Sequence, residues 1–439
     1  MRTVAAIVAL AACGSSAPPG PVADVSGAEP TFAPGSATMS DLVGISYQLP
    51  ADATLRAFAV AQLAQAGIRH ARADVTWSIS EPARGARDFT WFHAEADAYA
   101  GAGVEVLPII DYGNPWANQA PHDNDRYPPD HLADFAAYAG ATAHELGFPA
   151  YEVWNEENVG FDFWRPREQP DQYGTLLADA AAQIRSAQPG ARVVFGGLFG
   201  LAEVNLDAET FLQLAYRAHG GLGKAYDVLA VHPYPIYPPH SPPELDDDAT
   251  GEIAEPRTIA QLRAALAYWG DDPAREIWVT EIGWPTYQNV DEERQARWLV
   301  RSALVLAGAG VTRVYFYSLI DDPSVVPPED SFGLFRAGDP PVPKLAWTAV
   351  TTLLARCGEL AVTDDVTAQL AGAPADAHAY ALTGGSSRVV VVWRTNDDAP
   401  ATTVTMPFTP AAVIDMDGTA LATTASVPLS GRPVYVIEN

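Results

Sequence analysis

Two glutamates follow apolar, strand-like runs in the middle of the chain. Glu156 comes shortly after Tyr151–Trp154, and Glu281 comes directly after Glu276–Thr280. Each stands among Asn, Gly and Trp residues, and two such carboxyl groups are a stronger signal than one. Cleavage of a glycosidic bond needs one carboxyl group that protonates the leaving oxygen and a second that attacks carbon or activates water. The pair therefore indicates hydrolytic chemistry on a sugar.

The neighbours of the two glutamates suit these two roles. A general acid needs a raised pKa, and Trp154 with its apolar neighbours would raise the pKa of Glu156 by excluding water. A nucleophile must stay ionised, and Arg72 at the end of another predicted strand would lower the pKa of Glu281. A salt-bridged strand-end residue is the alternative explanation of Arg72.

Eight strand-like runs alternate with eight amphipathic segments between residues 42 and 356. This strict alternation predicts a (β/α)8 TIM barrel, whose active site lies at the C-terminal ends of the strands. A doubly wound open sheet is the alternative, but no Gly-rich phosphate-binding turn follows the first strand. The predicted strands are Leu42–Tyr47, Arg69–Val75, Glu105–Ile110, Tyr151–Trp154, Arg192–Gly196, Asp227–Val231, Glu276–Thr280 and Arg313–Tyr317.

The pattern changes after the barrel, which is expected to span residues 41–357. Short alternating runs separated by turn signals predict a β-sandwich-like accessory domain of antiparallel strands over residues 358–439. We expect a scaffold packed on the barrel. Carbohydrate binding is the alternative, with Trp393 as its obvious exposed aromatic residue. The predicted strands are Ser387–Arg394, Thr402–Phe408, Val413–Met416 and Arg432–Glu438.

The N-terminus has the features of a secretion signal. A short apolar run ends in Leu10–Gly14 (Leu-Ala-Ala-Cys-Gly), which resembles a bacterial lipobox. Residues 1–13 are interpreted as a signal peptide whose Cys13 is lipidated, with an ordinary cleaved signal or a misassigned start as alternatives. Residues 14–40, rich in Gly, Ser, Ala and Pro, are interpreted as a tether. The expected location is the cell envelope, lipid-anchored, or the secreted fraction.

One segment resembles a known group of enzymes. Glu152–Glu156 (Glu-Val-Trp-Asn-Glu), followed by Phe163–Trp164, is similar to a segment of the clan A glycoside hydrolases, closest to family 39. The resemblance implies that Glu156 is the acid/base and Glu281 the nucleophile of a retaining β-glycosidase. It also implies that Asn155 binds the sugar 2-hydroxyl.

The resemblance assigns further residues and has two departures. Arg72 matches the arginine that keeps the nucleophile ionised, and His232 and Tyr234 match the histidine and tyrosine that flank it. A hydrogen-bonded core histidine is the alternative for His232. Glu157 stands where the family usually has Pro, and Tyr317 lies in the stretch where a Trp is expected near the end of the last strand.

Aromatic residues in or after the predicted βα loops are candidate platforms for sugar rings, which stack their apolar faces on such side chains. For each of them core or loop packing is an equally good explanation. The candidates are Trp77, Tyr112, Trp116, Phe161, Trp164, Tyr237, Trp284 and Tyr317.

The composition limits the possible partners. A net charge of −28 argues against nucleic acid. No His-x-x-x-His or Cys-x-x-Cys spacing occurs, and neither a metal nor another cofactor is predicted. The expected partner is an oligo- or polysaccharide, with the membrane reached only through the lipid anchor, and the protein is expected to be a monomer. The alternatives are a non-catalytic cell-surface glycan-binding protein and a transglycosylase or exopolysaccharide-processing enzyme.

Overall fold

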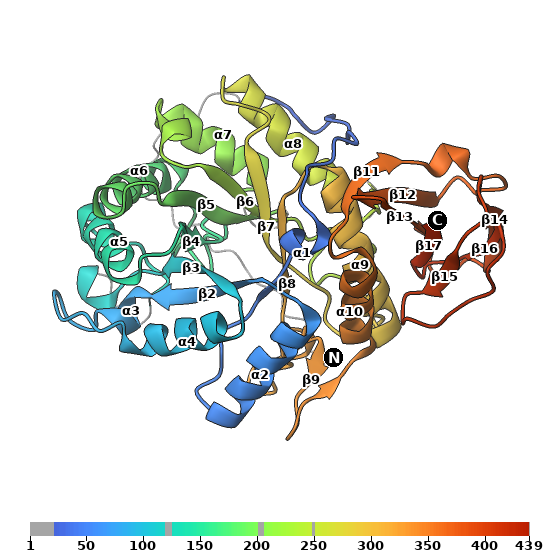
Figure 1. Ribbon diagram of the computed structural model, residues 1–439. Helices are drawn as coiled ribbons and strands as arrows, with labels where there is room; N and C mark the ends of the chain where they lie inside the picture. Colours follow the sequence, from blue (N-terminus) through green and yellow to red (C-terminus); the bar gives the residue numbers. More distant parts are fainter. Residues whose placement is uncertain (1–21, 119–124, 201–205, 248–250, 439) are drawn as a thin grey trace, which may run out of the picture.

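Eight parallel strands close into a barrel in the computed structural model, which describes residues 22–118, 125–200, 206–247 and 251–438 (Figure 1). Each strand pairs with the next, and β8 pairs back with β1. The closed ring confirms the predicted TIM barrel over the open sheet. The strands are β1 (Val43–Ser46), β2 (His70–Thr76), β3 (Glu105–Asp111), β4 (Ala150–Asn155), β5 (Arg192–Phe199), β6 (Val228–His232), β7 (Glu276–Ile282) and β8 (Arg313–Tyr317).

Helices form the outer layer around the strands (Figure 1). Asp52, Asp207 and Asp291 each cap a helix by accepting a hydrogen bond from the backbone N–H three residues later, which fixes where α2, α7 and α9 begin. The helices are α1 (Met39–Leu42), α2 (Ala53–Ala66), α3 (Trp77–Ser80), α4 (Thr90–Gly101), α5 (Leu132–Leu146), α6 (Pro170–Ala187), α7 (Ala208–Ala218), α8 (Glu255–Tyr268), α9 (Glu292–Gly308) and α10 (Leu345–Cys357). A short hairpin, β9 (Phe335–Arg336) and β10 (Val342–Pro343), precedes α10.

The segment 23–38 lies against the outside of the molecule, which corrects the prediction of a free tether over this part of the chain. The backbone of Ala23 exchanges hydrogen bonds of 2.8 and 3.0 Å with the side chain of Gln213 in α7. The ring of Phe32 packs edge-on against Tyr380, with 5.0 Å between centroids.

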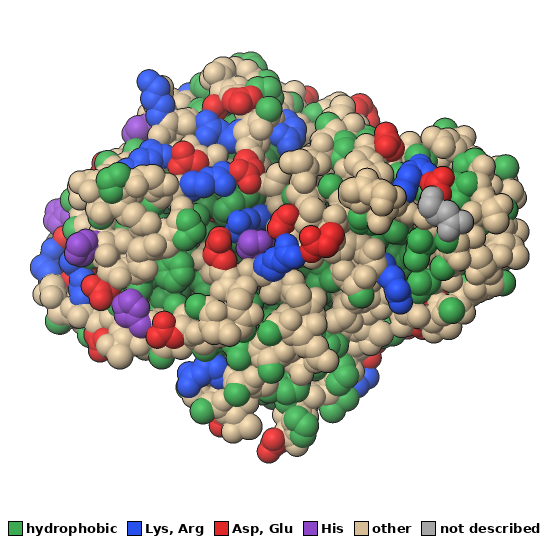
Figure 2. Space-filling model, viewed as in Figure 1, with side chains coloured by type: hydrophobic (Ala, Val, Ile, Leu, Met, Phe, Trp, Pro, Cys, Tyr) green, Lys and Arg blue, Asp and Glu red, His purple; other side chains and the backbone are tan. Residues whose placement is uncertain are grey.

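The predicted signal peptide, including Cys13, lies outside the described residues. Within the part of the chain that is described, no helix is long and apolar enough to cross a membrane. On the face shown in Figure 2, acidic and basic side chains are interspersed near the middle of the barrel rather than separated by sign.

Two antiparallel sheets follow α10, in the orders β11-β12-β13-β17-β15 and β14-β16. They enclose a separate apolar core, in which Val390, Val392 and Val436 are fully buried. The four predicted runs overlap β13, β14, β15 and β17, whereas β11, β12 and β16 were not predicted. The strands are β11 (Ala361–Asp365), β12 (Ala377–Gly384), β13 (Ser387–Arg394), β14 (Thr402–Thr405), β15 (Ala412–Asp415), β16 (Ser426–Leu429) and β17 (Val434–Glu438).

A buried charge cluster joins the β domain to the barrel. Trp393 is fully buried and its indole N–H donates to Glu244 at 2.7 Å, so it cannot be the exposed sugar platform of the alternative interpretation. Arg301 of α9, also fully buried, pairs with Glu244 and with Asp397. Burial alone would raise the pKa of Glu244, but Arg301 outweighs it and the pKa is lowered. Breaking such a buried pair typically costs about 3–5 kcal/mol, so the cluster fixes the two parts together.

Candidate active site

A cleft of about 730 Å³ opens at the C-terminal ends of the barrel strands. Its walls come from several strands that are far apart in sequence, because the barrel brings all eight strand ends to one rim. Residues of five strands reach it, and they are Ser46, Arg72, Asn155, Glu281 and Tyr317.

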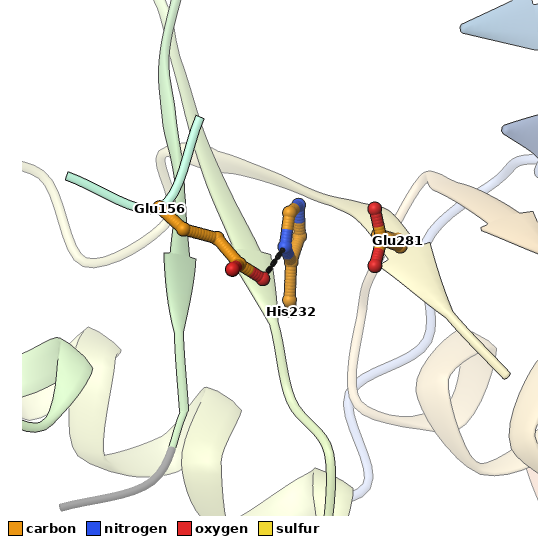
Figure 3. A group of neighbouring side chains, drawn as sticks. All are labelled: Glu156, His232 and Glu281. Carbon is orange, nitrogen blue, oxygen red and sulfur yellow. Dashed lines mark hydrogen bonds and ion pairs between the residues drawn. The ribbon is translucent and has the colours of Figure 1, made fainter. Parts of the chain in front are cut away.

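The two predicted carboxyl groups meet in this cleft. One oxygen of Glu156, one oxygen of Glu281 and an imidazole nitrogen of His232 all lie within 4.8 Å of one another (Figure 3). Carboxyl groups about 5–5.5 Å apart allow direct attack on carbon, whereas about 6.5–9.5 Å leaves room for a water molecule. The observed spacing belongs to the shorter class.

The backbone at the end of β4 is strained where it presents Glu156. Trp154 and Glu156 have φ angles of 73° and 50°, in the left-handed region that residues with a side chain seldom adopt. Each such residue costs of the order of 1–3 kcal/mol and persists where the surrounding structure enforces it, commonly at functional sites. The N–H of Glu156 donates to the carbonyl of Gly197 in β5 at 3.1 Å, which holds the turn.

Glu281 receives two hydrogen bonds. The Tyr234 hydroxyl donates to one oxygen at 2.8 Å, and Nη1 of Arg72 lies 3.4 Å from the other. Burial raises the pKa of Glu281 to about 7, although Arg72 and Tyr234 both act to lower it. Glu281 can therefore be ionised near neutral pH.

The main partner of Arg72 is Glu152, which the sequence analysis missed. Nε and Nη2 of Arg72 donate to the two oxygens of Glu152 at 2.9 and 3.0 Å, and the pair is almost fully buried. Nη2 also donates to Oδ1 of Asn155 at 2.7 Å, and Nδ2 of Asn155 donates to the Tyr112 hydroxyl at 3.0 Å. Arg72 thus orients Asn155 as well as Glu281. A single acidic residue inside the apolar run of β4 was the available signal.

His232 lies close to both glutamates, and its hydrogen bond goes to Glu156 rather than to Glu281. Its Nδ1 lies 2.7 Å from Oε1 of Glu156, and Figure 3 shows this contact. Burial and the charge of Arg72 lower the pKa of His232 well below its usual value, so the ring is neutral. Burial, and next the charge of Glu281, raise the pKa of Glu156 well above its usual value.

A chain of hydrogen bonds fixes which nitrogen of His232 carries the proton. The Thr280 hydroxyl donates to Glu152 at 3.1 Å, and it has no second hydrogen to give. Thr280 must therefore accept from Nε2–H of His232, 3.1 Å away, which leaves Nδ1 with a lone pair. That lone pair can only accept from Glu156, so the chain favours the protonated, acidic form of Glu156.

Two adjacent glycines of β5 make room for this arrangement. A Cβ at Gly197 would lie 2.1 Å from Nε2 of His232, and a Cβ at Gly196 would lie 2.1 Å from a carboxyl oxygen of Glu157. Glu157 is fully buried against β5 and does not line the cleft, so it does not crowd the acid/base.

The predicted sugar platforms divide into two groups. Trp164 and Trp284 are fully buried and lie outside the cleft wall, which corrects their prediction as substrate-binding residues. Trp284 donates its indole N–H to Ser241, and Trp77 is buried in the same way. Trp116 is half-buried and also absent from the cleft wall. Those that line the cleft are Tyr112, Phe161, Tyr237 and Tyr317.

Further charged groups, which were not predicted from the sequence, also line the cleft. The carboxyl groups of Asp74, Asp162, Asp322 and Glu329 add to the two glutamates, and the Arg126 guanidinium lies 3.9 Å from the centre of the Tyr112 ring. The acidic excess favours a neutral or cationic substrate over an anionic one.

One group of possible metal ligands occurs among the described residues. It consists of Glu156, His232 and Glu281, whose ligand atoms lie close enough together to hold an ion. Nδ1 of His232 is already bonded to Glu156, and Arg72 lies 3.4 Å from Glu281. A cation placed there would be repelled by the guanidinium. A hydrogen-bonded pair of acids accounts for the cluster better than a metal site does.

Replacing Glu281 with Gln is expected to stabilise the protein at pH 8. Because the pKa of Glu281 is raised in the folded state, the native protein favours the protonated form, and stability is lost as the pH rises from about 4.5 to about 7. The amide removes this loss, so the free energy of unfolding should rise by about 1–3 kcal/mol at pH 8 and change little at pH 4. Thermal denaturation measures it, with Glu29→Gln as the exposed control. A gain in the free energy of unfolding at pH 4 that vanishes at pH 8 would contradict the expected direction of the pH dependence.

No family model and no curated protein matches the chain. Solved structures do match. A family 39 glycoside hydrolase from the gut symbiont Bacteroides cellulosilyticus WH2 aligns with a TM-score of 0.75 at 19% identity, over 92% of this chain and 82% of that one. A monomeric β-xylosidase from Caulobacter crescentus CB15 gives 0.64 at 16% identity, covering 93% and 97%.

A third similar structure comes from another glycosidase family. The family 30 endoxylanase of Clostridium papyrosolvens C71 gives a TM-score of 0.60 at 12% identity, over 93% of this chain and 99% of that one. The chain is therefore structurally similar to clan A glycoside hydrolases and shares their TIM-barrel fold.

Proposed function

We propose that this protein is a retaining glycoside hydrolase that cleaves a β-glycosidic bond in a glycan or glycoconjugate. One observation carries the proposal: the carboxyl groups of Glu156 and Glu281 face each other across the C-terminal rim of the barrel with oxygens within 4.8 Å. The environments differ as the two roles require. Glu156 bonds to a neutral histidine, whereas Glu281 accepts from Tyr234 and Arg72.

The reaction proceeds in two displacements. An oxygen of Glu281 attacks the anomeric carbon, the bond to the leaving oxygen breaks, and that oxygen takes the proton of Glu156. Glu156, now ionised beside the Nδ1 lone pair of His232, then takes a proton from water as the water oxygen attacks the same carbon. The bond to Glu281 breaks, and two inversions give net retention.

A non-catalytic glycan-binding protein is less well supported, because it has no need of two carboxyl groups with opposed environments. Transglycosylation differs only in the acceptor, since a second sugar then replaces water in the second step.

Proton NMR of freshly formed product tests the proposal. A panel of 4-nitrophenyl glycosides and β-linked polysaccharides identifies the sugar, and the anomeric signal of the first product should keep the β configuration. An α product would contradict the two-step mechanism. Absence of cleavage across the panel, with oligosaccharides still bound in calorimetry, would favour the binding protein.

The hydrogen-bond chain behind Glu156 predicts a shift in the pH profile. Thr280→Val removes the acceptor that holds the proton on Nε2 of His232, so the ring can place it on Nδ1 and stabilise the ionised form of Glu156. The alkaline limb of kcat/KM should then move to lower pH by about one unit. Thr280→Ser keeps the hydroxyl and should leave the limb in place. A limb that moves upward, or moves equally in both variants, would rule out the chain.

We also propose that the protein is lipid-anchored in the cell envelope through Cys13. Cys13→Ser should leave it without acyl mass and outside the membrane fraction, as measured by mass spectrometry and fractionation of the producing cell. Unchanged membrane association with no acyl group on the native protein would rule out the anchor.

A further inference from the structure

The mouth of the cleft gathers exposed apolar side chains. Eight large hydrophobic side chains are exposed among the described residues, and four of them line this one cleft. Isolated exposed apolar residues are normal on a protein surface, but a group of them around a cavity marks a binding site. The four, with their exposed fractions, are Phe161 (58%), Tyr237 (38%), Val325 (43%) and Val326 (76%).

Two of these residues belong to the side of the cleft where Glu156 acts. Phe161 lies in the loop after β4, five residues beyond Glu156, and both line the cleft. Tyr237 lies in the loop after β6, which ends at His232, the hydrogen-bond partner of Glu156 at 2.7 Å, and the Tyr237 hydroxyl donates to Glu329. Because the acid protonates the leaving group, residues on its side face the leaving group.

Val325 and Val326 are connected to this side of the cleft through the hydrogen bond between Tyr237 and Glu329. Val325 and Val326 precede Glu329 in the loop after β8, and Glu329 is bonded to Tyr237. The ring of Tyr237 in turn packs edge-on against Phe199, 5.6 Å between centroids. The loops after β4, β6 and β8 and the end of β5 thus contribute to one apolar mouth.

The valine side chains favour one of two kinds of leaving group, an apolar group or a further sugar. A further sugar would present hydroxyl groups, and a branched aliphatic side chain offers them neither a hydrogen bond nor a flat ring. An alkyl or aryl group would remove the exposed valine surface from water and gain the hydrophobic term. The carboxyl groups nearby, Asp162, Asp322 and Glu329, disfavour an anionic group.

We propose, on the basis of the glycosidase function above, that the leaving-group side of this cleft takes an uncharged apolar aglycone, alkyl or aryl, in preference to a further sugar. The substrate class is then a β-glycoside of a hydrophobic alcohol, such as a glycolipid. Phe161, Tyr237, Val325 and Val326 hold the aglycone while Glu156 protonates its oxygen.

Alkyl glycosides of increasing chain length test the proposal. Calorimetry with methyl, butyl and octyl β-D-glucosides below their micelle concentrations measures binding to the intact protein. Release of sugar from the same series, made with the sugar that the aryl-glycoside panel identifies, measures kcat/KM. Both affinity and kcat/KM should rise with chain length, by up to roughly fourfold for each methylene that becomes buried.

The matched variants are Val325→Ser with Val326→Ser, and Val342→Ser as an exposed valine of β10 outside the cleft. The double variant should lose most of the chain-length dependence of both affinity and kcat/KM. Val342→Ser should behave as wild type. Affinity and kcat/KM independent of chain length, with a disaccharide preferred to the octyl glycoside, would overturn the proposal. Chain-length-dependent binding without cleavage of any glycoside would support the apolar site and defeat the hydrolase function.

Discussion

Replacing Glu281 with Ala is expected to lower kcat for an aryl β-glycoside by roughly 10⁵-fold, the size of effect seen when a catalytic nucleophile is removed. In the proposed mechanism the side chain supplies the atom that bonds to the sugar, and Tyr234 and Arg72 are placed to act on it at 2.8 and 3.4 Å. Its side chain is 18% exposed, so the truncation leaves a small opening to the cleft and not a buried cavity.

An added small anion distinguishes loss of the nucleophile from general damage. Azide or formate can occupy the space left by Glu281→Ala and attack the sugar once, giving an α-glycosyl product by a single inversion. Glu329→Gln is the control for a cleft carboxyl group that does not react, and it should lose less than about tenfold. A β-glycosyl azide from Glu281→Ala, or equal losses in both variants, would contradict the role of nucleophile.

The barrel, and the meeting of Glu156 and Glu281 in one cleft, followed from sequence because each depends on a regular pattern. Eight β/α units specify a closed ring, and strand ends in such a ring meet at one rim, so Glu156 and Glu281 were placed together although 124 positions separate them in the printed sequence. Which side chains hydrogen-bond to one another inside the rim was harder to predict. Strand alternation gives the face of a residue and not which atom it bonds. Arg72 was therefore matched with Glu281, which lies 3.4 Å away, while Glu152 takes two closer bonds at 2.9 and 3.0 Å.

The tryptophans show a second limit of sequence reasoning. Trp164 and Trp284 stand close in sequence to catalytic motifs, yet both are fully buried. Trp164 packs against Trp154 with 4.8 Å between ring centroids, so it supports the strained end of β4 from behind. A large apolar ring near a site can serve the substrate or the backbone that presents the acid, and burial decides between them.

Replacing Glu156 with Ala is expected to separate substrates by their leaving group. A poor leaving group such as an alkoxide needs the proton, and its kcat/KM should fall by about 10³-fold. A dinitrophenyl glycoside needs little protonation in the first step, so that step should be nearly unaffected and the second step should become limiting. Azide should then restore turnover and give a β-glycosyl azide, since the intermediate on Glu281 is attacked from the opposite face.

The neighbouring carboxyl group provides the matched control. Glu157 is fully buried, and burial raises its pKa well above the usual value, so Glu157→Gln replaces a neutral acid with a neutral amide of the same shape. This variant should keep activity within about tenfold of wild type on both classes of substrate and show no azide rescue, because its side chain lies against Gly196 and away from the cleft. If Glu157→Gln shows the leaving-group dependence and azide rescue while Glu156→Ala does not, the acid/base is Glu157 and the geometry of the end of β4 has been misread.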